Sequence, residues 1–283
     1  AEHENDDVSA LVSARLGVKG SIARTRTQLL LNLAKFGRIG MPYNISGAHT
    51  GRLSGADKLN VQNFPSGRVK GQTKVLRQAL MAPPGHVVVG ADSAQVEARV
   101  LAYASGAKRL LDLFLSGDCP YSDMAIHIFG VKDATPKQVK QWAKDGVEDY
   151  GTLRRPLGKE AVLGCGYGMG AERFFESCAS KGVVISKELA LMAVQTYRTT
   201  HVEVPAFWRT CDQVLRSMME GRSGAFGGPN GDLFYYDGAR VIFGQRVPGI
   251  RLPDGYWLNY FNLRQEDTEE RGKTLLFDQQ DGG

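Results

Sequence analysis

Apolar residues along this chain follow two different spacings. In most of the first 220 residues they recur three or four positions apart, which predicts helices. After Gly221 they lie in short runs with aromatic and β-branched neighbours, separated by turn residues, which predicts strands and hairpins. Helices are expected over the ranges 8–36, 95–116, 121–129, 136–145, 154–165, 171–181 and 187–220.

Local signals sharpen several of these boundaries. Thr135-Pro136 and Ser186 are typical helix starts. Asp237-Gly238 and Asp254-Gly255 are typical hairpin turns. Residues 37–74 are rich in Gly, Ser and Asn, which indicates a backbone that follows another backbone or a solvated loop.

A run of valines predicts one buried strand. His86-Val-Val-Val-Gly-Ala-Asp92 follows the turn-forming Pro83-Pro84-Gly85, and helical spacing begins at Ser93. An Asp at the end of such a strand, just before a helix, can hold a divalent cation against a phosphate. It can equally serve as an ordinary helix cap.

Two cations, an apolar residue and a phenol stand four residues apart in the range 154–168: Arg155, Lys159, Leu163 and Tyr167. Each four-residue step turns only ~40° around a helix, so these side chains form one stripe, ~18 Å long. That length suits a nucleoside triphosphate lying lengthwise. An ordinary basic solvent face is the alternative, but four glycines between 158 and 168 disfavour a purely structural helix.

Together these segments resemble the DNA polymerase I family (family A), and the phage members look most similar. Asp92-Ser-Ala-Gln-Val-Glu-Ala-Arg99 is similar to the family's palm metal-binding motif, and Arg155 to Gly168 to its fingers-helix motif. Thr50 to Ser54 and Asn60 to Pro65 are similar to the segment that grips the template–primer, and Leu76 to Pro83 to the lead-in to the first catalytic strand. The resemblance covers roughly residues 45 to 210.

The resemblance implies an α+β fold, with a right-hand palm of antiparallel sheet and helices and with mostly helical fingers. Residues 1–105 would be the N-terminal palm part, with the template–primer grip and the first catalytic strand. Residues 106–220 would be the fingers, and residues 221–283 a hairpin-rich return toward the palm that ends before the second catalytic motif. The thumb and part of the palm are expected to be absent from this chain.

The resemblance also implies roles for individual residues. Two Mg²⁺ ions would be held by the catalytic Asp92 and by the backbone carbonyl of Ser93. The nucleotide would be contacted by Arg155, Lys159, Leu163, Tyr167, Gln95, Glu97 and Tyr121. Glu97 would exclude a 2′-hydroxyl and so select deoxynucleotides. DNA would be contacted by Arg52, Gln62, Asn63, Arg77 and Gly168.

The chain departs from the family pattern at several positions. Ser93 replaces the usual Tyr, Leu163 a usual Phe or Tyr, and Tyr121 a common phosphate-contacting His. No His is followed by Asp in the sequence, so the family's late His-Asp-Glu motif is missing. We expect a second polypeptide to supply that motif and the thumb, as in a split or cleaved enzyme.

The leading hypothesis is therefore a fragment of a template-directed DNA polymerase that uses dNTPs and template–primer DNA. A single-subunit RNA polymerase is one alternative, although Glu97 argues against it. A template–primer or nucleotide-binding module without catalysis is the other.

Composition is compatible with these hypotheses. The net charge of +5 and a pI of about 9.0 suit a polyanionic partner. Four cysteines without paired spacing indicate an intracellular protein, in the cytoplasm of a bacterial host if it is phage-encoded. The five scattered histidines predict no zinc site, and no apolar run predicts a membrane span.

Overall fold

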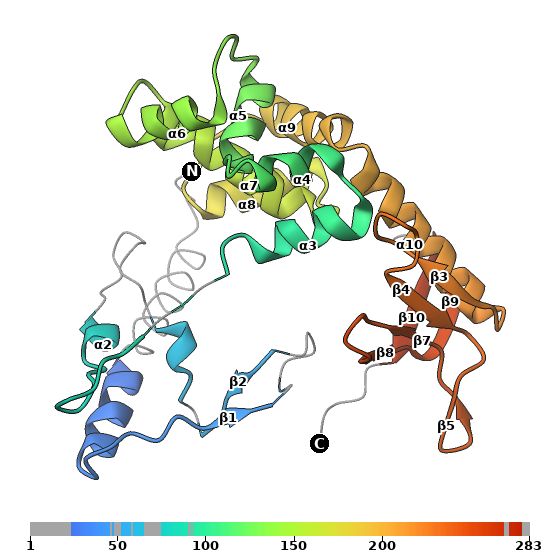
Figure 1. Cartoon of the computed structure of the whole chain (residues 1–283), viewed down its shortest axis with the longest axis horizontal. Helices are drawn as coiled ribbons and strands as arrows, with labels where there is room; N and C mark the ends of the chain where they lie inside the picture. The colour runs from blue at the N-terminus through green and yellow to red at the C-terminus, as the bar shows by residue number, and fades with distance from the viewer. Residues whose placement is uncertain are drawn as a thin grey trace, which may run out of the picture. The chain divides into compact units, whose positions relative to one another are not determined.

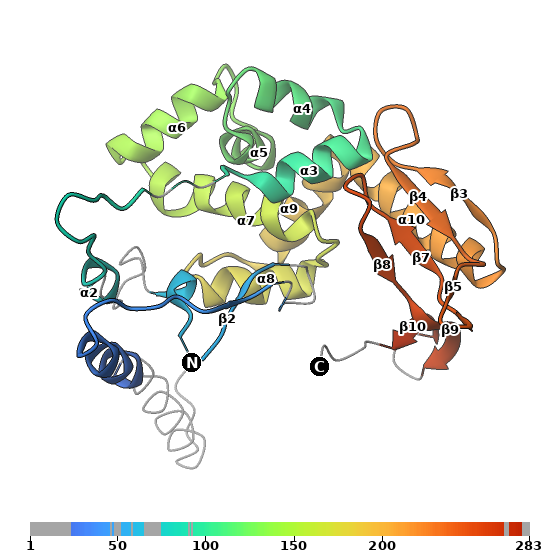
Figure 2. The same cartoon turned by 60° about the horizontal axis from the view of Figure 1, so that its bottom comes forward.

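The computed structural model describes residues 24–45, 47, 52–57, 59–64, 75–89, 91, 93–268 and 272–278. By its contacts the chain divides into two units, with the division between Ala91 and Asp92. Both are drawn in Figures 1 and 2.

The first unit consists of short elements around a small core. Residues 24–34 are helical, and strands β1 (Tyr43–Asn44) and β2 (Ser54–Gly55) pair antiparallel. A 3₁₀ turn η1 (Val61–Asn63) and helix α2 (Val75–Gln78) follow. The core consists of Leu30, Leu59 and Phe64.

The second unit begins with a cluster of helices around one apolar core. These are α3 (Val96–Ser105), α4 (Lys108–Leu115), α5 (Pro120–Phe129), α6 (Pro136–Asp145), the π-helical turn η2 (Tyr150–Arg154), α7 (Arg155–Cys165), α8 (Ala171–Ser180), α9 (Lys187–Thr200) and α10 (Glu203–Met219). The core includes Leu110, Met124, Leu157, Phe174 and Tyr197, each no more than 1% exposed. Helix α10 continues from α9 toward the sheet (Figures 1 and 2).

Helix ends follow the predicted signals where those signals are local. The Thr135 side chain and Gln138 form a reciprocal capping box at the start of α6. Ser186 Oγ accepts a hydrogen bond from the Leu189 backbone N–H at the start of α9. Two predicted long helices are instead divided, one at Gly106, which has a left-handed φ of 67°, and one at His201.

The chain then forms antiparallel strands that pack on α10. The largest sheet has the order β3–β4–β7–β8, and the rings of Phe207, Phe226 and Phe234 join it to α10. The strands are β3 (Ser223–Phe226), β4 (Phe234–Asp237), β5 (Val241–Ile242), β6 (Gln245–Arg246), β7 (Gly249–Arg251), β8 (Trp257–Asn259), β9 (Phe261–Thr268) and β10 (Gly272–Asp278). The predicted α+β class is confirmed.

One of the two predicted hairpin turns is wrong. Asp254-Gly255 lies between the paired strands β7 and β8, as predicted. Strand β4, however, ends at Asp237 and pairs with β7, with Asp237 opposite Gly249. The small β5–β6 hairpin is inserted between them. The Asp237 carboxylate accepts a hydrogen bond from the Ala239 N–H, so the local turn forms without joining adjacent strands.

The predicted buried strand is also wrong over residues 86–89. Residues 86–89 form no strand, and Val87, Val88 and Val89 are 83%, 73% and 85% exposed. A strand requires a hydrogen-bonded neighbour, and no described residue pairs with this run. Within the described residues, no helix combines the length and apolar character needed to cross a membrane.

Candidate nucleotide-binding site

The candidate site begins where the π-helical turn passes into α7. Two adjacent arginines lie there with different surroundings. Arg154 is bound by protein: its Nε lies 2.5 Å from Asp149 Oδ1, and its Nη1 lies 3.2 Å from the Tyr150 hydroxyl. Among the described residues, Arg155 makes one hydrogen bond, from its Nη2 to the sulfur of Cys119 at 3.8 Å. Its Nε is buried and has no hydrogen-bond partner among the described residues.

Three other predicted residues meet near this guanidinium. Tyr121 lies in the first turn of α5 and shares a hydrogen bond with Gln95, while the charges of Glu97 and Arg155 both act on its phenol. Burial raises the pKa of Tyr121, and the charges of Cys119 and Glu97 raise it further against the opposing effects of Gln95 and Arg155. The starts of α3, α5 and α7 therefore converge on one phenol.

Cys119 is a member of this site that sequence reasoning missed. Its side chain is 8% exposed. Burial acts to raise the pKa of the Cys119 thiol, but the neighbouring backbone N–H of Ser122 and the charge of Arg155 outweigh it, so the pKa is lowered overall. The only sequence signal was its position two residues before Tyr121. Its contact with Arg155 joins residues 36 positions apart, which no local pattern reveals.

The predicted stripe continues along α7 for only part of its length. Lys159 is exposed and Leu163 half-buried, but the helix ends at Cys165. Tyr167, which is 73% exposed, lies in the turn that follows. Gly168 ends this turn with a φ of 76°, a conformation that favours glycine. The helical stripe therefore runs from Arg155 to Leu163, a rise of ~12 Å, and Tyr167 stands beyond it.

One of the glycines in this segment has a packing role. A β-carbon at Gly158 would overlap the carbonyl oxygen of Tyr121 and lie 2.9 Å from the Ala125 backbone nitrogen. Gly158 therefore lets α7 approach the backbone of α5, and this approach brings Arg155 close to Tyr121. Gly158, one of the four glycines that were expected to disfavour a purely structural helix, thus serves the packing of two helices.

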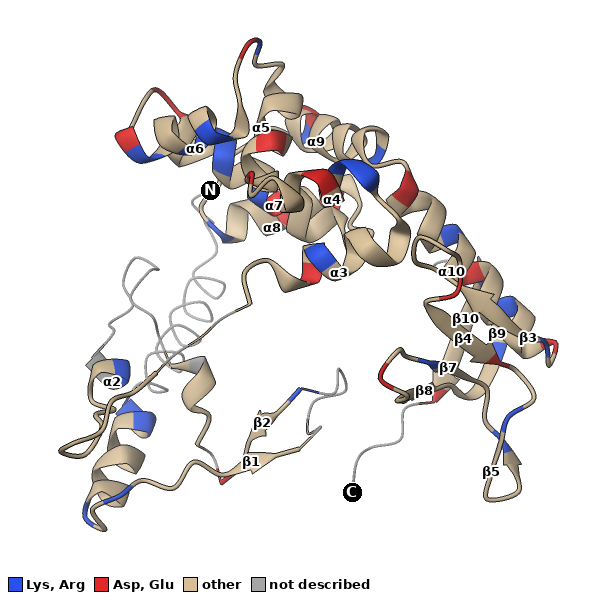
Figure 3. Ribbon diagram, viewed as in Figure 1, with Lys and Arg blue, Asp and Glu red and all other residues tan. Residues whose placement is uncertain are grey.

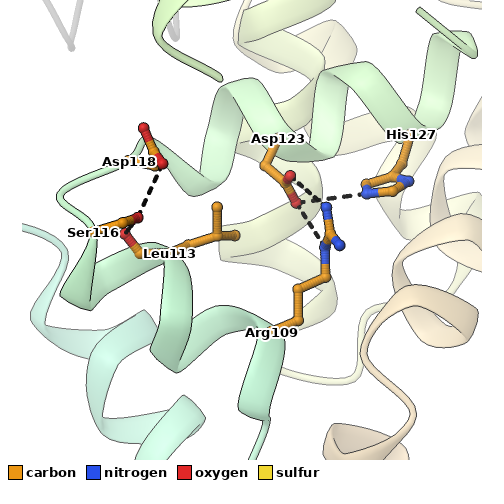
Figure 4. Close-up of polar contacts among 6 residues, drawn as sticks. All are labelled: Arg109, Leu113, Ser116, Asp118, Asp123 and His127. Atoms are coloured by element: carbon orange, nitrogen blue, oxygen red, sulfur yellow. Dashed lines mark hydrogen bonds and ion pairs between the residues drawn. The ribbon is translucent and has the colours of Figure 1, made fainter. Parts of the chain in front are cut away.

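An ion pair between a half-exposed arginine and a buried aspartate fixes the helix that carries Tyr121. Arg109 on α4 donates two hydrogen bonds to Asp123 on α5, Nε to Oδ2 at 3.1 Å and Nη2 to Oδ1 at 2.6 Å (Figure 4). His127 Nε2 lies 3.7 Å from the same Oδ2. Asp123 is only 3% exposed, so its charge depends on these partners.

The predicted metal ligands are Asp92 and the backbone carbonyl of Ser93. Asp92 lies outside the described residues. Ser93 is described and exposed, two residues before the left-handed Gln95 that precedes α3. Among the described residues, no three His, Cys, Asp or Glu side chains are grouped as a metal site would require.

The predicted DNA-contacting residues other than Gly168 belong to the first unit. Arg52 is exposed just before β2, and Gln62 is exposed on η1. Asn63 is the last residue of η1. Arg77 on α2 donates from Nη2 to the Phe64 carbonyl at 3.3 Å, so part of its hydrogen-bonding capacity joins α2 to the end of η1.

Comparison with known proteins defines the class of this fold. A solved structure of the polymerase domain of Pol1 from M. smegmatis, in complex with DNA primer-template and dNTP, has a similar fold. The TM-score is 0.52 at 24% identity, over 75% of this chain and 33% of that one. The fold of this chain is therefore similar to part of a polymerase domain.

The chain belongs to DNA polymerase family A, whose pattern matches residues 18–221. The thermostable DNA polymerase I of a Thermus thermophilus strain is 30% identical over 241 residues, which cover 85% of this chain and 23% of the relative. The DNA polymerase I of Chloroflexus aurantiacus is 38% identical over 135 residues, covering 45% and 14%. This chain thus spans less than a quarter of the length of these relatives.

Proposed function

We propose that this chain carries the nucleotide-binding part of a template-directed DNA polymerase, which adds deoxynucleotides to a primer 3′-hydroxyl. The observation that carries the proposal is the buried, unsatisfied Nε of Arg155 at the start of α7. A buried donor without a partner costs free energy. A phosphate oxygen would satisfy it with a charge-assisted hydrogen bond, and family A membership supports a nucleoside triphosphate as its source.

The side chains around Arg155 would then act on different parts of the nucleotide. Arg155 and the exposed Lys159 would neutralise the phosphates, and Tyr121 would donate one hydrogen bond. Glu97 would occupy the space of a 2′-hydroxyl, with Gln95 supporting the same pocket. Leu163 would lie beside the base, and Tyr167 near the templating position.

Asp92 and the Ser93 carbonyl are proposed to hold magnesium. Two bound Mg²⁺ ions would lower the charge on the attacking and leaving oxygens. The exposed Ser93 is compatible with a ligand role for its carbonyl. Because the Asp92 carboxylate lies outside the described residues, its part in this site rests on the motif alone.

Template–primer DNA would be bound by Arg52, Gln62, Asn63, Arg77 and Gly168. These residues would contact sugars, phosphates and the minor groove, which is a sequence-tolerant mode of binding. The M. smegmatis neighbour was solved with DNA primer-template and dNTP, which supports the same ligands for this chain.

A second polypeptide is proposed to complete the catalytic site. The sequence lacks a His-Asp pair, and Val87, Val88 and Val89 are exposed and pair with no strand among the described residues. Strands of a chain that carries the His-Asp-Glu motif would cover these valines. A phage origin and action in a bacterial cytoplasm remain parts of this proposal.

Binding of a fluorescent dATP analogue with Mg²⁺ would test the nucleotide site. Arg155→Gln and Lys159→Gln are each expected to weaken binding about tenfold or more, since each removes a charge-assisted contact of about 1.5–3 kcal/mol. Lys187→Gln, at the exposed start of α9, is the matched control. Equal binding by all four proteins would reject the site.

Primer extension would test the catalytic and split-enzyme parts separately. The purified chain alone is expected to leave a primer unextended. A mixture with a chain that carries His-Asp-Glu and a thumb should extend it, and Asp92→Ala should abolish that activity. Extension by the chain alone would contradict the need for a second polypeptide. Extension by Asp92→Ala in the mixture would contradict the role of Asp92.

A further inference from the structure

A groove of 880 Å³ lies where α9 ends and α10 begins, away from the start of α7. Its lining combines cationic, aromatic and small residues: Gly168, Arg198, Thr199, Val202, Pro205, Trp208, Arg209, Asp212 and Gln213. Every lining residue belongs to the second unit. Its volume falls in the range of about 300–1,000 Å³ that is usual for ligand sites. We refer to it as the α9–α10 groove.

Helical spacing gathers the groove residues on one face of α10. Val202, Pro205, Arg209 and Asp212 follow one another at intervals of three and four residues. Trp208 packs against the core of the helical cluster, yet its ring is only partly buried and lines the groove. The core contacts therefore hold an aromatic surface at the groove wall.

The groove is positively charged. Arg209 is exposed and forms no ion pair with any residue that the structure describes. Asp212, the acidic residue of the lining, is neutralised by Arg216, whose Nε lies 2.8 Å from Asp212 Oδ2. Lys and Arg segments recur along α10 in Figure 3. The lining therefore has an excess of cationic groups available to an anionic ligand.

Arg198 connects this groove to the turn after α7. Its Nη2 donates to the carbonyl oxygen of Met169 at 3.4 Å, and the neighbouring Gly168 lines the groove directly. The groove therefore begins where the segment containing Tyr167 ends. A DNA strand with one base near Tyr167 could continue into the α9–α10 groove while contacting only the second unit.

We propose that the α9–α10 groove binds unpaired, single-stranded DNA, irrespective of sequence. Arg198 and Arg209 pair with successive phosphates, and a base stacks on the Trp208 ring. Guanidinium groups beside an anchored aromatic ring suit a single strand, because every base offers a π face while its backbone stays accessible. That this strand is the unpaired 5′ part of a template rests on the proposed polymerase function.

Fluorescence of the full chain tests the groove without any nucleotide addition. With oligo(dT) as the probe, binding is expected to quench tryptophan emission, and Trp208→Phe should remove most of this quench while keeping a ring in the core. Each of Arg198→Gln and Arg209→Gln should weaken binding about threefold to tenfold and reduce the salt dependence of log K by about one. Arg222→Gln, beyond the end of α10 and paired with Glu220, is the matched control.

Binding of DNA duplexes with and without an overhang distinguishes the groove from the rest of the proposed DNA-binding surface. The two arginine variants should bind a blunt-ended duplex as the unchanged chain does, but should lose affinity for a duplex with a long 5′ template overhang. Unchanged oligo(dT) binding in both variants would overturn the proposal, as would an equal loss on blunt duplex. Overhang binding through these residues, with no primer extension even when the chain that carries His-Asp-Glu and a thumb is added, would reject the polymerase function and leave the groove assigned.

Discussion

Gly158 on α7 lies against the backbone of Tyr121 on α5, so closely that a β-carbon would overlap the Tyr121 carbonyl oxygen. This contact sets how near Arg155 lies to Tyr121, Gln95 and Glu97. The distance between two helix backbones thus determines the geometry of the proposed phosphate site.

Gly158→Ala is accordingly expected to lower the free energy of unfolding by about 1–3 kcal/mol, because the added methyl forces α5 and α7 apart. Urea denaturation of the full chain measures the loss. Gly40→Ala is the control, since a β-carbon there meets no atom within 4 Å. Equal stability of the two variants would show that the helices separate without cost.

Arg109→Leu should destabilise the chain by about 1–3 kcal/mol, because the buried carboxylate of Asp123 loses both hydrogen bonds from Arg109 and keeps only His127 as an ion-pair partner among the described residues. The double variant Arg109→Leu/Asp123→Leu removes both charges and should recover most of this loss. Thermal or urea unfolding of the three proteins checks the pair. A double variant no more stable than Arg109→Leu would contradict this account.

His201 is expected to make the chain acid-sensitive. Its ring is 1% exposed, and neither ring nitrogen has a hydrogen-bond partner among the described residues. Burial lowers the pKa of His201 from 6.5 to about 4, although Asp123 opposes this shift while Arg109 and His127 add to it. The unfolded chain therefore binds the extra proton first as the pH falls.

Stability should consequently be full above pH 6.5 and fall between pH 6.5 and about 4, by up to about 1.4 kcal/mol per pH unit. His201→Phe keeps a ring beside Tyr197 and should flatten this part of the profile. The measurement is urea unfolding at several pH values. An unchanged slope in His201→Phe would assign the acid sensitivity to other groups.

Glu97→Ala should relax sugar selection if Glu97 fills the space of a 2′-hydroxyl. The ratio of rNTP to dNTP affinity is expected to rise about tenfold or more, as when a pocket gains room for one group. Glu176→Ala, on the exposed side of α8, should leave the ratio unchanged. A ratio that stays constant in Glu97→Ala would favour the alternative of a ribonucleotide enzyme or a binding module.

The sequence predicted those features that depend on neighbouring residues. Helix α6 begins at Pro136 as expected, because the capping box of Thr135 lies within four residues. The division between α9 and α10 was missed although the sequence carries a local signal for it: Pro205 lies in the first turn of α10, and a proline inside a helical pattern interrupts the helix. Cys119 was missed for a different reason, because its importance comes from Arg155 on another helix.

The valine run illustrates a second limit. A continuous apolar stretch indicates a buried strand only when other strands are present to cover it. Residues 86–89 have the composition of a central strand without a described neighbour. Whether residues 86–89 form a strand therefore depends on neighbouring strands, which no pattern within the run can reveal.

The uncovered valines at positions 87 to 89 also affect how the isolated polypeptide should behave on purification. An exposed β-branched segment can pair as a strand with the same segment of identical molecules. Concentrated samples are therefore expected to aggregate, and co-expression with a chain of the proposed kind, one that carries His-Asp-Glu, should keep them dispersed.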